Sequence, residues 1–421
     1  MLPEGWRATW IRELAEVVRG SSPRPAGDPR YFDGDYLPWI TVADVTTDER
    51  MHLTSTRTNL TEAGSELTRI IEPGTLVLTN SGATLGVPKI TTMRAGANDG
   101  IAMLINLHGV SKPYLYYFLQ SKTNYLREVV APGVGQPNLN TELIGSIPIA
   151  LPPPSEQICI AETLSAWDEA ISASERLLTN GRARKNALAA AMLMGKRRIG
   201  HFSKQTGFRS TPHGHIPEDW SYPAIAEVAS EVNERHVSGQ PYPVLSCTKH
   251  AGLVDSLAYF KKQVFSKDLS TYKVVPRRTF AYATNHIEEG SIGYQDLYEH
   301  GLVSPMYTVF RTTDRVCDGY LYRLLKTERF RQIFEAATNS SVNRRGSLRW
   351  NDFKKLRIPL PSIEEQEEIA ELLDTADQEI DLLQQQVQKL RQEKTALMQQ
   401  LLTGKRRVRV PVTAAAEAEP A

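Results

Sequence analysis

The clearest pattern in the chain is a helical heptad repeat close to its C-terminal end. From Ile369 to Leu401, apolar residues recur at alternating spacings of four and three positions with one interruption. This spacing places the side chains along one seam of a helix and is typical of a coiled coil. Ser362 and Glu365 stand in capping-box spacing at the start, and Gly404 marks the end. The pattern predicts one long helix.

A second helix with the same register lies earlier in the chain, where Ser174 and Gly181 weaken its seam. Both helices carry a lysine, Lys185 or Lys394, at one equivalent seam position, which either sets the register of a pair or extends outward to water. The matched seams favour pairing of the two helices, although each helix could instead cover only its own globular region. The predicted pairing residues are Ile160, Leu164, Ile171 and Leu178 in the first helix and Ile369, Leu373, Ile380, Leu383, Val387 and Leu390 in the second.

The helices belong to a larger internal duplication. Residues Ile149–Arg198 align with Ile358–Arg407, sharing a proline-rich junction followed by Glu-Gln and a Gly-Lys-Arg-Arg ending. The segment openings repeat as well, since Pro-Glu-Gly-Trp at residues 3–6 corresponds to Pro-Glu-Asp-Trp at residues 217–220. We expect a first globular region over residues 1–150, a central helix over 151–198, a linker over 199–215, a second globular region over 216–358, a C-terminal helix over 359–407 and a disordered tail over 408–421.

The globular regions mix short apolar runs with Gly, Pro and Asp, and each contains one helical stretch, Pro113–Glu128 or Cys317–Ala337. This alternation predicts two α+β domains. Apart from landmarks such as the Tyr-Leu-Tyr at residues 114–116 and 320–322, the two regions share little sequence. A conserved frame with a divergent interior indicates related modules with different ligands. The predicted strands are Leu37–Val42, Thr75–Thr79, Ile101–Asn106, Val244–Cys247, Thr279–Thr284 and Tyr307–Arg311.

Composition and charge narrow the class of protein. A hydrophobic fraction of 41% with 23% charged residues is that of a soluble globular protein. The net charge of +1 gives no overall attraction to a polyanion, so any nucleic-acid surface must be local. The cysteines Cys159, Cys247 and Cys317 are widely separated, which indicates neither a disulfide framework nor a zinc site and fits a reducing cytoplasm. Without a signal-peptide pattern or a membrane-length apolar run, we expect a cytoplasmic protein with no membrane partner.

Motifs of catalysis are absent from the sequence. It contains no Walker loop, no Gly-x-Gly-x-x-Gly, no Asn/Asp-Pro-Pro-Tyr/Phe and no Gly-x-Ser-x-Gly. His213 and His215 lie in the linker, where a solvated turn is favoured over a ligand pair. We therefore expect a protein that is not an enzyme by itself and that holds neither metal nor cofactor.

Two polar, flexible stretches, Gly133–Asn140 and Ser340–Trp350, precede the helices at equivalent places. Asn and Gln can bind adenine and Arg can bind guanine through paired hydrogen bonds, while Gly and Ser allow phosphate to approach the backbone. The alternative is a capped turn that leads into a strand. With weaker positions elsewhere, the candidate DNA-binding residues are Asn80, Ser81, Gln136, Asn138, Asn140, Arg277, Asn285, His286, Asn343, Arg344, Arg345 and Arg349.

Each helix ends in a basic cluster. Positive charge at a helix C-terminus complements the helix dipole, and this is a sufficient structural explanation. Contact with DNA phosphate or with a partner protein is the functional alternative. The residues concerned are Lys196, Arg197, Arg198, Lys405, Arg406 and Arg407.

Together these motifs resemble those of the specificity subunits of type I restriction-modification systems, over nearly the whole chain. The Met-Leu-Met-Gly at residues 192–195 departs from the Leu-Leu-Thr-Gly that the second copy has. The residues that carry the resemblance are the junctions 151–157 and 360–366, Asp168 and Asp377, the ending 401–407 and the openings 2–6 and 216–220.

The resemblance implies two target-recognition domains, each reading one half of a split, asymmetric site in double-stranded DNA. It further implies that the helices pair as an antiparallel coiled coil with pseudo-twofold, circular symmetry and dock two modification subunits. Those partners would carry S-adenosylmethionine and methylate adenine. Separate restriction subunits would use ATP and Mg²⁺ for translocation and cleavage.

Other readings of the sequence stay open. An enzyme acting alone would need the motifs that are missing, and a pure protein scaffold would leave the divergence of the two regions unexplained. A subunit of a methylation-only system would have the same sequence features, because neighbouring genes decide that question.

Overall fold

The computed structural model describes residues 2–130, 138–203, 207–212, 214–237, 240–339 and 346–410. The chain forms two compact units. Unit 1 consists of Met1–Arg176 with Gln384–Ala421, and unit 2 of Leu177–Leu383. Most of the tail expected over 408–421 lies outside the described residues. Among the described residues, no helix combines the length and apolarity that a bilayer crossing requires.

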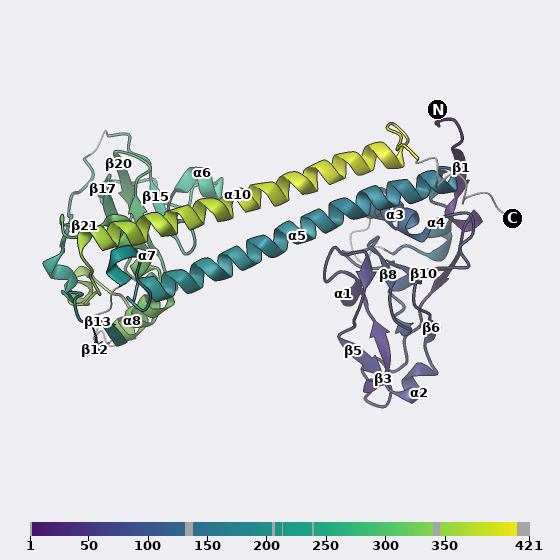
Figure 1. Cartoon of the computed structure of the whole chain (residues 1–421), viewed down its shortest axis with the longest axis horizontal. Helices are drawn as coiled ribbons and strands as arrows, with labels where there is room; N and C mark the ends of the chain where they lie inside the picture. Colours follow the sequence, from purple (N-terminus) through teal and green to yellow (C-terminus); the bar gives the residue numbers. More distant parts are fainter. Residues whose placement is uncertain are drawn as a thin grey trace. The chain divides into compact units, whose positions relative to one another are not determined.

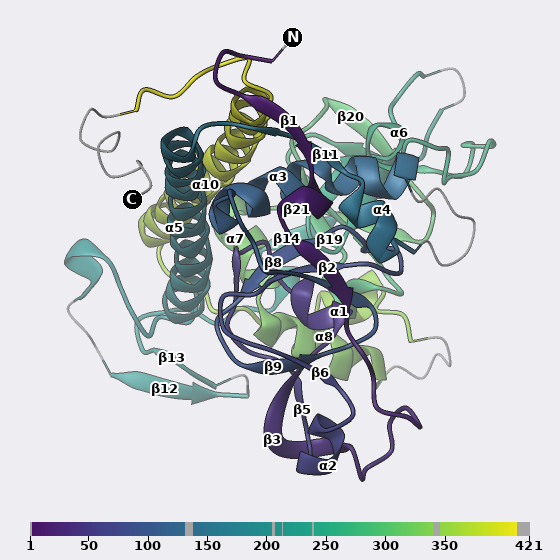
Figure 2. The same ribbon diagram turned by 90° about the vertical axis from the view of Figure 1, so that its right-hand side faces the viewer.

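Two long helices, α5 (Pro154–Met192) and α10 (Ile363–Leu402), confirm the helices predicted from the heptads. Within each unit they lie side by side and run antiparallel, as Figure 1 and Figure 2 show. In unit 1, Asp168 pairs with Lys394; in unit 2, Lys185 pairs with Asp377. Asp168 and Lys185 are as far apart along α5 as Asp377 and Lys394 are along α10, so both pairs obey one register. The predicted antiparallel pairing is confirmed.

Unit 1 contains two main sheets and the paired strands β1 (Arg7–Trp10) and β11 (Pro148–Leu151). The five-stranded sheet has the order β2 (Glu16–Arg19), β10 (Ile101–Ile105), β7 (Leu76–Thr79), β8 (Pro88–Thr91) and β4 (His52–Leu53). The four-stranded sheet has the order β5 (Thr58–Leu60), β3 (Phe32–Ile40), β9 (Ala95–Ala97) and β6 (Arg69–Ile71). Its helices are α1 (Val42–Val45), α2 (Glu62–Ser65), α3 (Lys112–Tyr125), with a π-helical turn at Leu126–Val130, and α4 (Thr141–Gly145).

The core of unit 1 combines the globular region with the ends of both long helices. Six consecutive residues of α3, Tyr114–Leu119, are buried against the five-stranded sheet. Ile160 and Leu164 near the start of α5 and Leu401 near the end of α10 belong to the same hydrophobic cluster. The start of α5 therefore packs both on its own globular region and on the end of α10. Both alternatives considered for this helix thus describe part of it.

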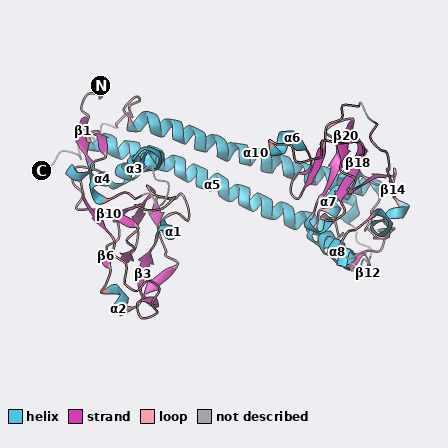
Figure 3. Cartoon of the chain, turned by 180° about the vertical axis from the view of Figure 1, so that it is seen from behind, coloured by secondary structure: helices cyan, strands magenta, loops and turns pink. Residues whose placement is uncertain are grey.

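Unit 2 is also α+β, as the mixture of helices and strands in Figure 3 shows. The pairs between its named strands are antiparallel, and Val244 and Leu302 form an isolated parallel bridge. Its four-stranded sheet has the order β14 (Ala229–Glu231), β21 (Tyr307–Thr312), β18 (Thr279–Ala283) and β19 (Ile292–Gln295). The two-stranded sheets are β12 (Phe208–Thr211) with β13 (Gly214–Pro217), β15 (Leu245–Thr248) with β16 (Gly252–Asp255), and β17 (Lys273–Pro276) with β20 (His300–Val303). The helices are α6 (Ser256–Phe260), α7 (Asp318–Leu325), α8 (Glu328–Asn339) and α9 (Trp350–Phe353).

The single helix predicted over Cys317–Ala337 is wrong, because the structure divides it into α7 and α8. The break falls at Lys326 and Thr327. The hydroxyl of Thr327 accepts a hydrogen bond from the Phe330 amide at 3.3 Å. A threonine that bonds an amide three residues onward caps a new helix start, which competes with continuation of the preceding helix.

The division into units differs from the boundaries expected from the sequence, which kept each long helix as one segment. Each helix packs on a different globular region at each end, because Met192 of α5 lies in the core of unit 2 and Leu402 of α10 in the core of unit 1. The expected linker over 199–215 contains strand β12 and the start of β13.

Candidate nucleic-acid interface

The two units contain an equivalent backbone junction. In unit 1, the Leu139 amide donates to the carbonyl of Asn80 at 2.7 Å; in unit 2, the Leu348 amide donates to the carbonyl of Thr284 at 2.7 Å. Both leucines are fully buried. The turn that follows the central strand β7 or β18 thereby meets the chain that enters the short helix α4 or α9. We call residues 80–82 with 138–140 junction 1 and residues 284–286 with 347–351 junction 2.

The junctions bring together candidate residues that lie far apart in the sequence. In junction 1, Ser81 forms a backbone bridge with Asn138. In junction 2, Asn285 and Arg349 line one cavity. Four other candidates, Gln136, Asn343, Arg344 and Arg345, lie outside the described residues, as does His213 of the linker.

Two of the candidates in junction 1 serve the fold. Asn80 is 1% exposed, and its side-chain amide donates to the carbonyl of Asp99 at 3.4 Å. The side-chain oxygen of Asn140 accepts the Leu143 amide at 2.7 Å and caps α4. Because a buried side chain and a capping side chain are unavailable to bases, we withdraw Asn80 and Asn140 as DNA contacts. The capped turn that was the alternative is the better description there. Ser81 and the exposed Asn138 stay in the candidate set.

Junction 2 lies on a cavity of about 1080 Å³. Its lining combines amides, hydroxyls, aromatic rings and charged groups, which is the mixture that base edges and phosphates require. Arg349 is exposed and, within the part of the chain that the structure describes, has no ion-pair partner. The ring of Trp350 stacks on Phe310 with centroids 5.7 Å apart, which fixes one wall. Other lining residues are Glu231, Lys273, Thr284, Asn285, Tyr307, Ser347 and Asn351.

Two polar side chains that line this cavity, Lys273 and Tyr307, are held by hydrogen bonds within the protein. Lys273 is half-buried and donates from Nζ to the carbonyl of Tyr307 at 2.7 Å. Burial lowers the pKa of Lys273, and the nearby Glu231 carboxylate partly offsets this effect. Burial also raises the pKa of Tyr307, so its hydroxyl stays neutral and accepts the Cys247 amide at 3.1 Å. These groups are held by the fold, which leaves Arg349 and Asn285 as the freer polar groups at the rim.

Arg277 does not join junction 2. It precedes the start of β18, whereas Asn285 follows the end of that strand. Its guanidinium pairs with Glu299 and with Asp296, at 2.9 Å in both cases. Hydrogen bonds to these two carboxylates raise the pKa of Arg277. Because its charge is already balanced within the protein, Arg277 is a weaker candidate for base reading than Arg349, and its role stays a prediction.

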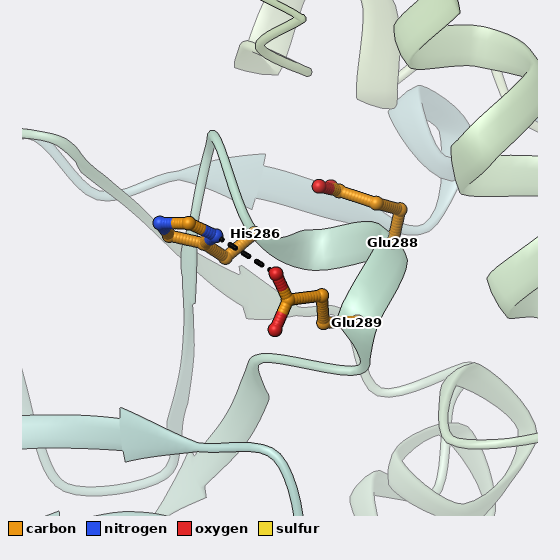
Figure 4. A group of neighbouring side chains, drawn as sticks. All are labelled: His286, Glu288 and Glu289. Carbon is orange, nitrogen blue, oxygen red and sulfur yellow. Dashed lines mark hydrogen bonds and ion pairs between the residues drawn. The ribbon is translucent and has the colours of Figure 1, made fainter.

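His286 belongs to a small group with the half-buried Glu288 and the exposed Glu289 (Figure 4). Its Nδ1 lies 3.2 Å from Oε1 of Glu289. One ligand atom from each of the three residues lies within 4.8 Å of the others. Exposed carboxylates often approach a histidine without a metal, so this geometry assigns no ion. The contact with the Glu289 carboxylate also makes His286 a weaker candidate for phosphate than Arg349.

The basic helix ends divide into buried and exposed members. Arg198 forms two bonds of 2.7 Å to Glu365, whose side chain is 1% exposed, and Trp220 donates to the same carboxylate at 3.1 Å. Arg198 itself is 4% exposed, so the prediction that it contacts phosphate or a partner is wrong. Its role is to neutralise the buried Glu365 within the fold.

Unit 1 repeats this arrangement with Arg407, Glu156 and Trp6. Arg407 bonds Glu156 at 2.9 and 2.7 Å, and Trp6 donates to Glu156 at 3.0 Å. Arg407 pairs in the same way, but 46% of its side chain is exposed, so its contact with phosphate or a partner stays a prediction. The sequence signal for this network was the recurrence of all three residues in both copies. Lys196, Arg197, Lys405 and Arg406 are exposed and stay available for phosphate or a partner.

The seam lysines Lys185 and Lys394 form ion pairs with aspartates of the opposite long helix and so fix the register of the helix pair. Lys394 donates to Asp168 at 2.6 Å, and Tyr117 of α3 donates to the same carboxylate at 2.8 Å. In unit 2, Lys185 pairs with Asp377, which also lies 3.8 Å from Arg323 of α7. Each aspartate therefore joins both long helices to its own globular region. The alternative in which these lysines extend freely into water is excluded.

Comparison with known proteins agrees with this arrangement. Residues 3–180 and 261–392 match a family model described as the type I restriction modification DNA specificity domain. The chain is 34% identical over 174 residues to the MjaIX specificity subunit of a type I restriction enzyme from Methanocaldococcus jannaschii, an alignment that covers 40% of this chain and 39% of that protein. It is 25% identical over 309 residues to the MjaVIII specificity subunit from the same organism, covering 70% of each.

The fold resembles solved structures over nearly its whole length. The S subunit of a type I restriction-modification system from M. genitalium covers 96% of this chain and 98% of its own, with a TM-score of 0.53 and 13% identity. A chain from a study of assembly and conformational transition of the type I R-M system covers 96% of this chain and 100% of its own, with a TM-score of 0.60 and 16% identity.

Proposed function

Because the chain belongs to the type I restriction-modification DNA specificity family, we propose that its two units each read one half of a split, asymmetric site in double-stranded DNA. The chain contributes recognition and no catalysis, and it acts in the cytoplasm.

One observation carries this proposal: the two junctions share a backbone frame and differ in their side chains. The bonds of Leu139 and Leu348 are equivalent. The candidates that surround them are Ser81 and Asn138 in unit 1 but Asn285 and Arg349 in unit 2. The same frame with different donors and acceptors supports recognition of two different half-sites, and hence an asymmetric site.

The chemistry of junction 2 suits a base edge. A guanidinium can donate two hydrogen bonds to O6 and N7 of guanine, and a carboxamide can bind N6 and N7 of adenine. Arg349 provides the first group at the cavity rim, and Asn285 and Asn351 provide the second. Ser347 adds a hydroxyl that can bind a phosphate.

We further propose that the chain directs two modification subunits, which supply S-adenosylmethionine and methylate adenine, and that restriction subunits supply ATP- and Mg²⁺-dependent cleavage. The duplicated contact frame supports two equivalent docking places. The exposed Lys196 and Arg197 in unit 2 and Lys405 and Arg406 in unit 1 are matched basic groups for partner or phosphate contact.

The proposal is tested by co-expressing the chain with its neighbouring modification subunit in a methylation-free host and mapping modified adenines by single-molecule sequencing. The modification subunit alone is the control. We expect a bipartite motif with a fixed gap only when both chains are present. A stable complex without any motif would show a scaffold that reads no base, and methylation by this chain alone would reveal a catalytic site.

A further inference from the structure

Unit 2 displays a short segment with an unusual surface, residues 257–264, which we call the arm. It comprises the last residues of α6 and the turn that follows, and α6 lies beside β15 in Figure 1. Four of its apolar side chains are large and exposed: Leu257 at 54%, Tyr259 at 53%, Phe260 at 38% and Val264 at 45%. Exposed apolar groups gathered in one segment mark an interaction site more often than isolated ones do.

The arm is held at both ends and is not a loose loop. On one side, Ser256 is fully buried and its hydroxyl lies 2.6 Å from that of Ser246 on β15. On the other side, the Ser266 amide donates to the hydroxyl of the buried Tyr272 at 3.2 Å. The fold therefore presents the apolar side chains outward while fixing the backbone on either side of them.

The arm is also positively charged. Lys261 and Lys262 are exposed, Lys267 follows shortly after, and residues 256–267 contain no acidic residue. None of the three lysines has an ion-pair partner among the residues that the structure describes. Asp255 and Asp268 flank this stretch, so the unpaired cations are concentrated within the arm itself. By contrast, Arg277 in the same unit is balanced by two carboxylates.

The β15–β16 hairpin, which leads into the arm, contacts a residue that lines the cavity of junction 2. Tyr307 lines that cavity, and its hydroxyl accepts the Cys247 amide of β15 at 3.1 Å. Strand β15 pairs with β16, which leads directly into the arm. A duplex that lies along the cavity wall therefore has the arm's supporting hairpin next to it.

We propose that the arm is a second DNA contact of unit 2, in which Lys261 and Lys262 neutralise backbone phosphates while Tyr259 and Phe260 pack against the neighbouring sugars and groove. This inference rests on the proposed function for the presence of DNA. Adjacent unpaired lysines match the regular negative charge of a duplex. Protein interfaces are depleted in lysine, so an acidic partner protein fits this surface less well. The arm supplies affinity without sequence preference, because phosphates and sugars are common to all sequences.

The test measures binding of the chain, in complex with its modification subunit, to a duplex carrying its mapped site and to a scrambled duplex at several salt concentrations. Each phosphate contact contributes roughly 0.9 to the slope of log affinity against log salt concentration. We expect Lys261→Gln/Lys262→Gln to lower that slope by about two on both duplexes. The matched control, Lys112→Gln/Lys389→Gln, changes the same charge at two other exposed lysines and should keep the wild-type slope.

A second variant separates the aromatic groups from the charges. Tyr259→Ser/Phe260→Ser removes no charge but removes apolar area that the duplex would bury, so we expect weaker binding of both duplexes by about tenfold with an unchanged salt slope. The methylation motif should be unchanged in every arm variant.

An unchanged salt slope in the lysine variant would overturn the inference. So would loss of the modification subunit from the complex with normal DNA affinity, since that result would make the arm a protein contact. Failure of the proposed function is distinct, because no motif would then be mapped, while the slope change on a scrambled duplex would still show the arm contact.

Discussion

Asp168 of α5 and Lys394 of α10 form an ion pair of 2.6 Å within unit 1. Lys394 is 11% exposed on its side chain, and Tyr117 of the globular region binds the same carboxylate. One aspartate thus joins three elements, and its counterpart Asp377 does so in unit 2.

Replacing Lys394 with methionine should lower the free energy of unfolding by about 2 kcal/mol, because it leaves Asp168 without its cation in a partly buried place. Urea denaturation followed by circular dichroism measures the change. Lys389 of the same helix is 76% exposed, so Lys389→Met should cost less than about 0.5 kcal/mol. Equal effects of the two substitutions would contradict a structural role for the Asp168 pair.

Arg198→Ala and Arg407→Ala remove the same group from the two copies of one network. Arg198 is 4% exposed, and its loss leaves the buried Glu365 without a cation. The free energy of unfolding should therefore fall by about 3–4 kcal/mol. Arg407 is 46% exposed, and water can replace part of its interaction with Glu156, so a clearly smaller loss of stability than for Arg198→Ala is expected. Thermal unfolding of both variants provides the comparison. A larger loss for Arg407→Ala would refute the argument from burial.

Arg349→Ala should relax recognition of one half-site by about 1–3 kcal/mol if the guanidinium binds a guanine. Competition between duplexes altered in either half-site shows which half loses discrimination. Arg277→Ala removes the same charge from a group already balanced by Asp296 and Glu299, and its motif should not change. Loss of discrimination in both half-sites would show a general contribution to affinity.

Asn140→Ala should reduce stability by about 1 kcal/mol through loss of the α4 cap, while the methylation motif stays the same. Asn140→Asp, which retains the capping oxygen, should restore most of that stability. A changed motif in the alanine variant would return Asn140 to the set of recognition residues.

Cys247 offers a test of burial through pH. Burial raises the pKa of its thiol to about 12. The unfolded chain loses the proton near pH 9, whereas the folded protein keeps it until about pH 12. Between these values the unfolded state is the one that ionises, so the stability contribution of this group is complete below pH 9 and falls as pH rises toward 12.

At pH 9 the reactive thiolate of Cys247 should therefore form far less in the native protein than in urea. We expect alkylation by iodoacetamide to be at least about 100-fold slower in the native state, from the roughly 3-unit difference in pKa. Site-resolved mass spectrometry follows the reaction. Equal rates in buffer and in urea would contradict the raised pKa of this partly buried thiol.

The long helices and the duplicated frame were predictable because they depend on local periodicity and on sequence repetition. Trp6, Glu156 and Arg407 recur as Trp220, Glu365 and Arg198, but the sequence does not specify the direction in which an arginine at a helix end points. That direction follows from the buried carboxylate that the other helix supplies, which is a tertiary property.

The sequence predicted a set of candidate recognition residues, but not which members of that set are accessible to DNA. Asn80 and Thr284 hold equivalent backbone positions, but Asn80 is buried beneath its junction, whereas the next residue of unit 2, Asn285, lines a cavity. Chemical type alone does not distinguish these environments. The break at Thr327 was missed for a similar reason, since an apolar helical pattern continues through it and only the hydroxyl reveals the new start.

The composition of the two units has a consequence for synthesis of the protein on the ribosome. Unit 2 is one continuous stretch, Leu177–Leu383, so all of its residues are available before translation ends. Unit 1 begins first but needs Leu401 and Leu402 for its core and Arg407 for its buried glutamate. The half of the protein that is translated first is therefore the last that can be completed, and the nascent chain must keep an unfinished N-terminal core in solution until its final helix emerges.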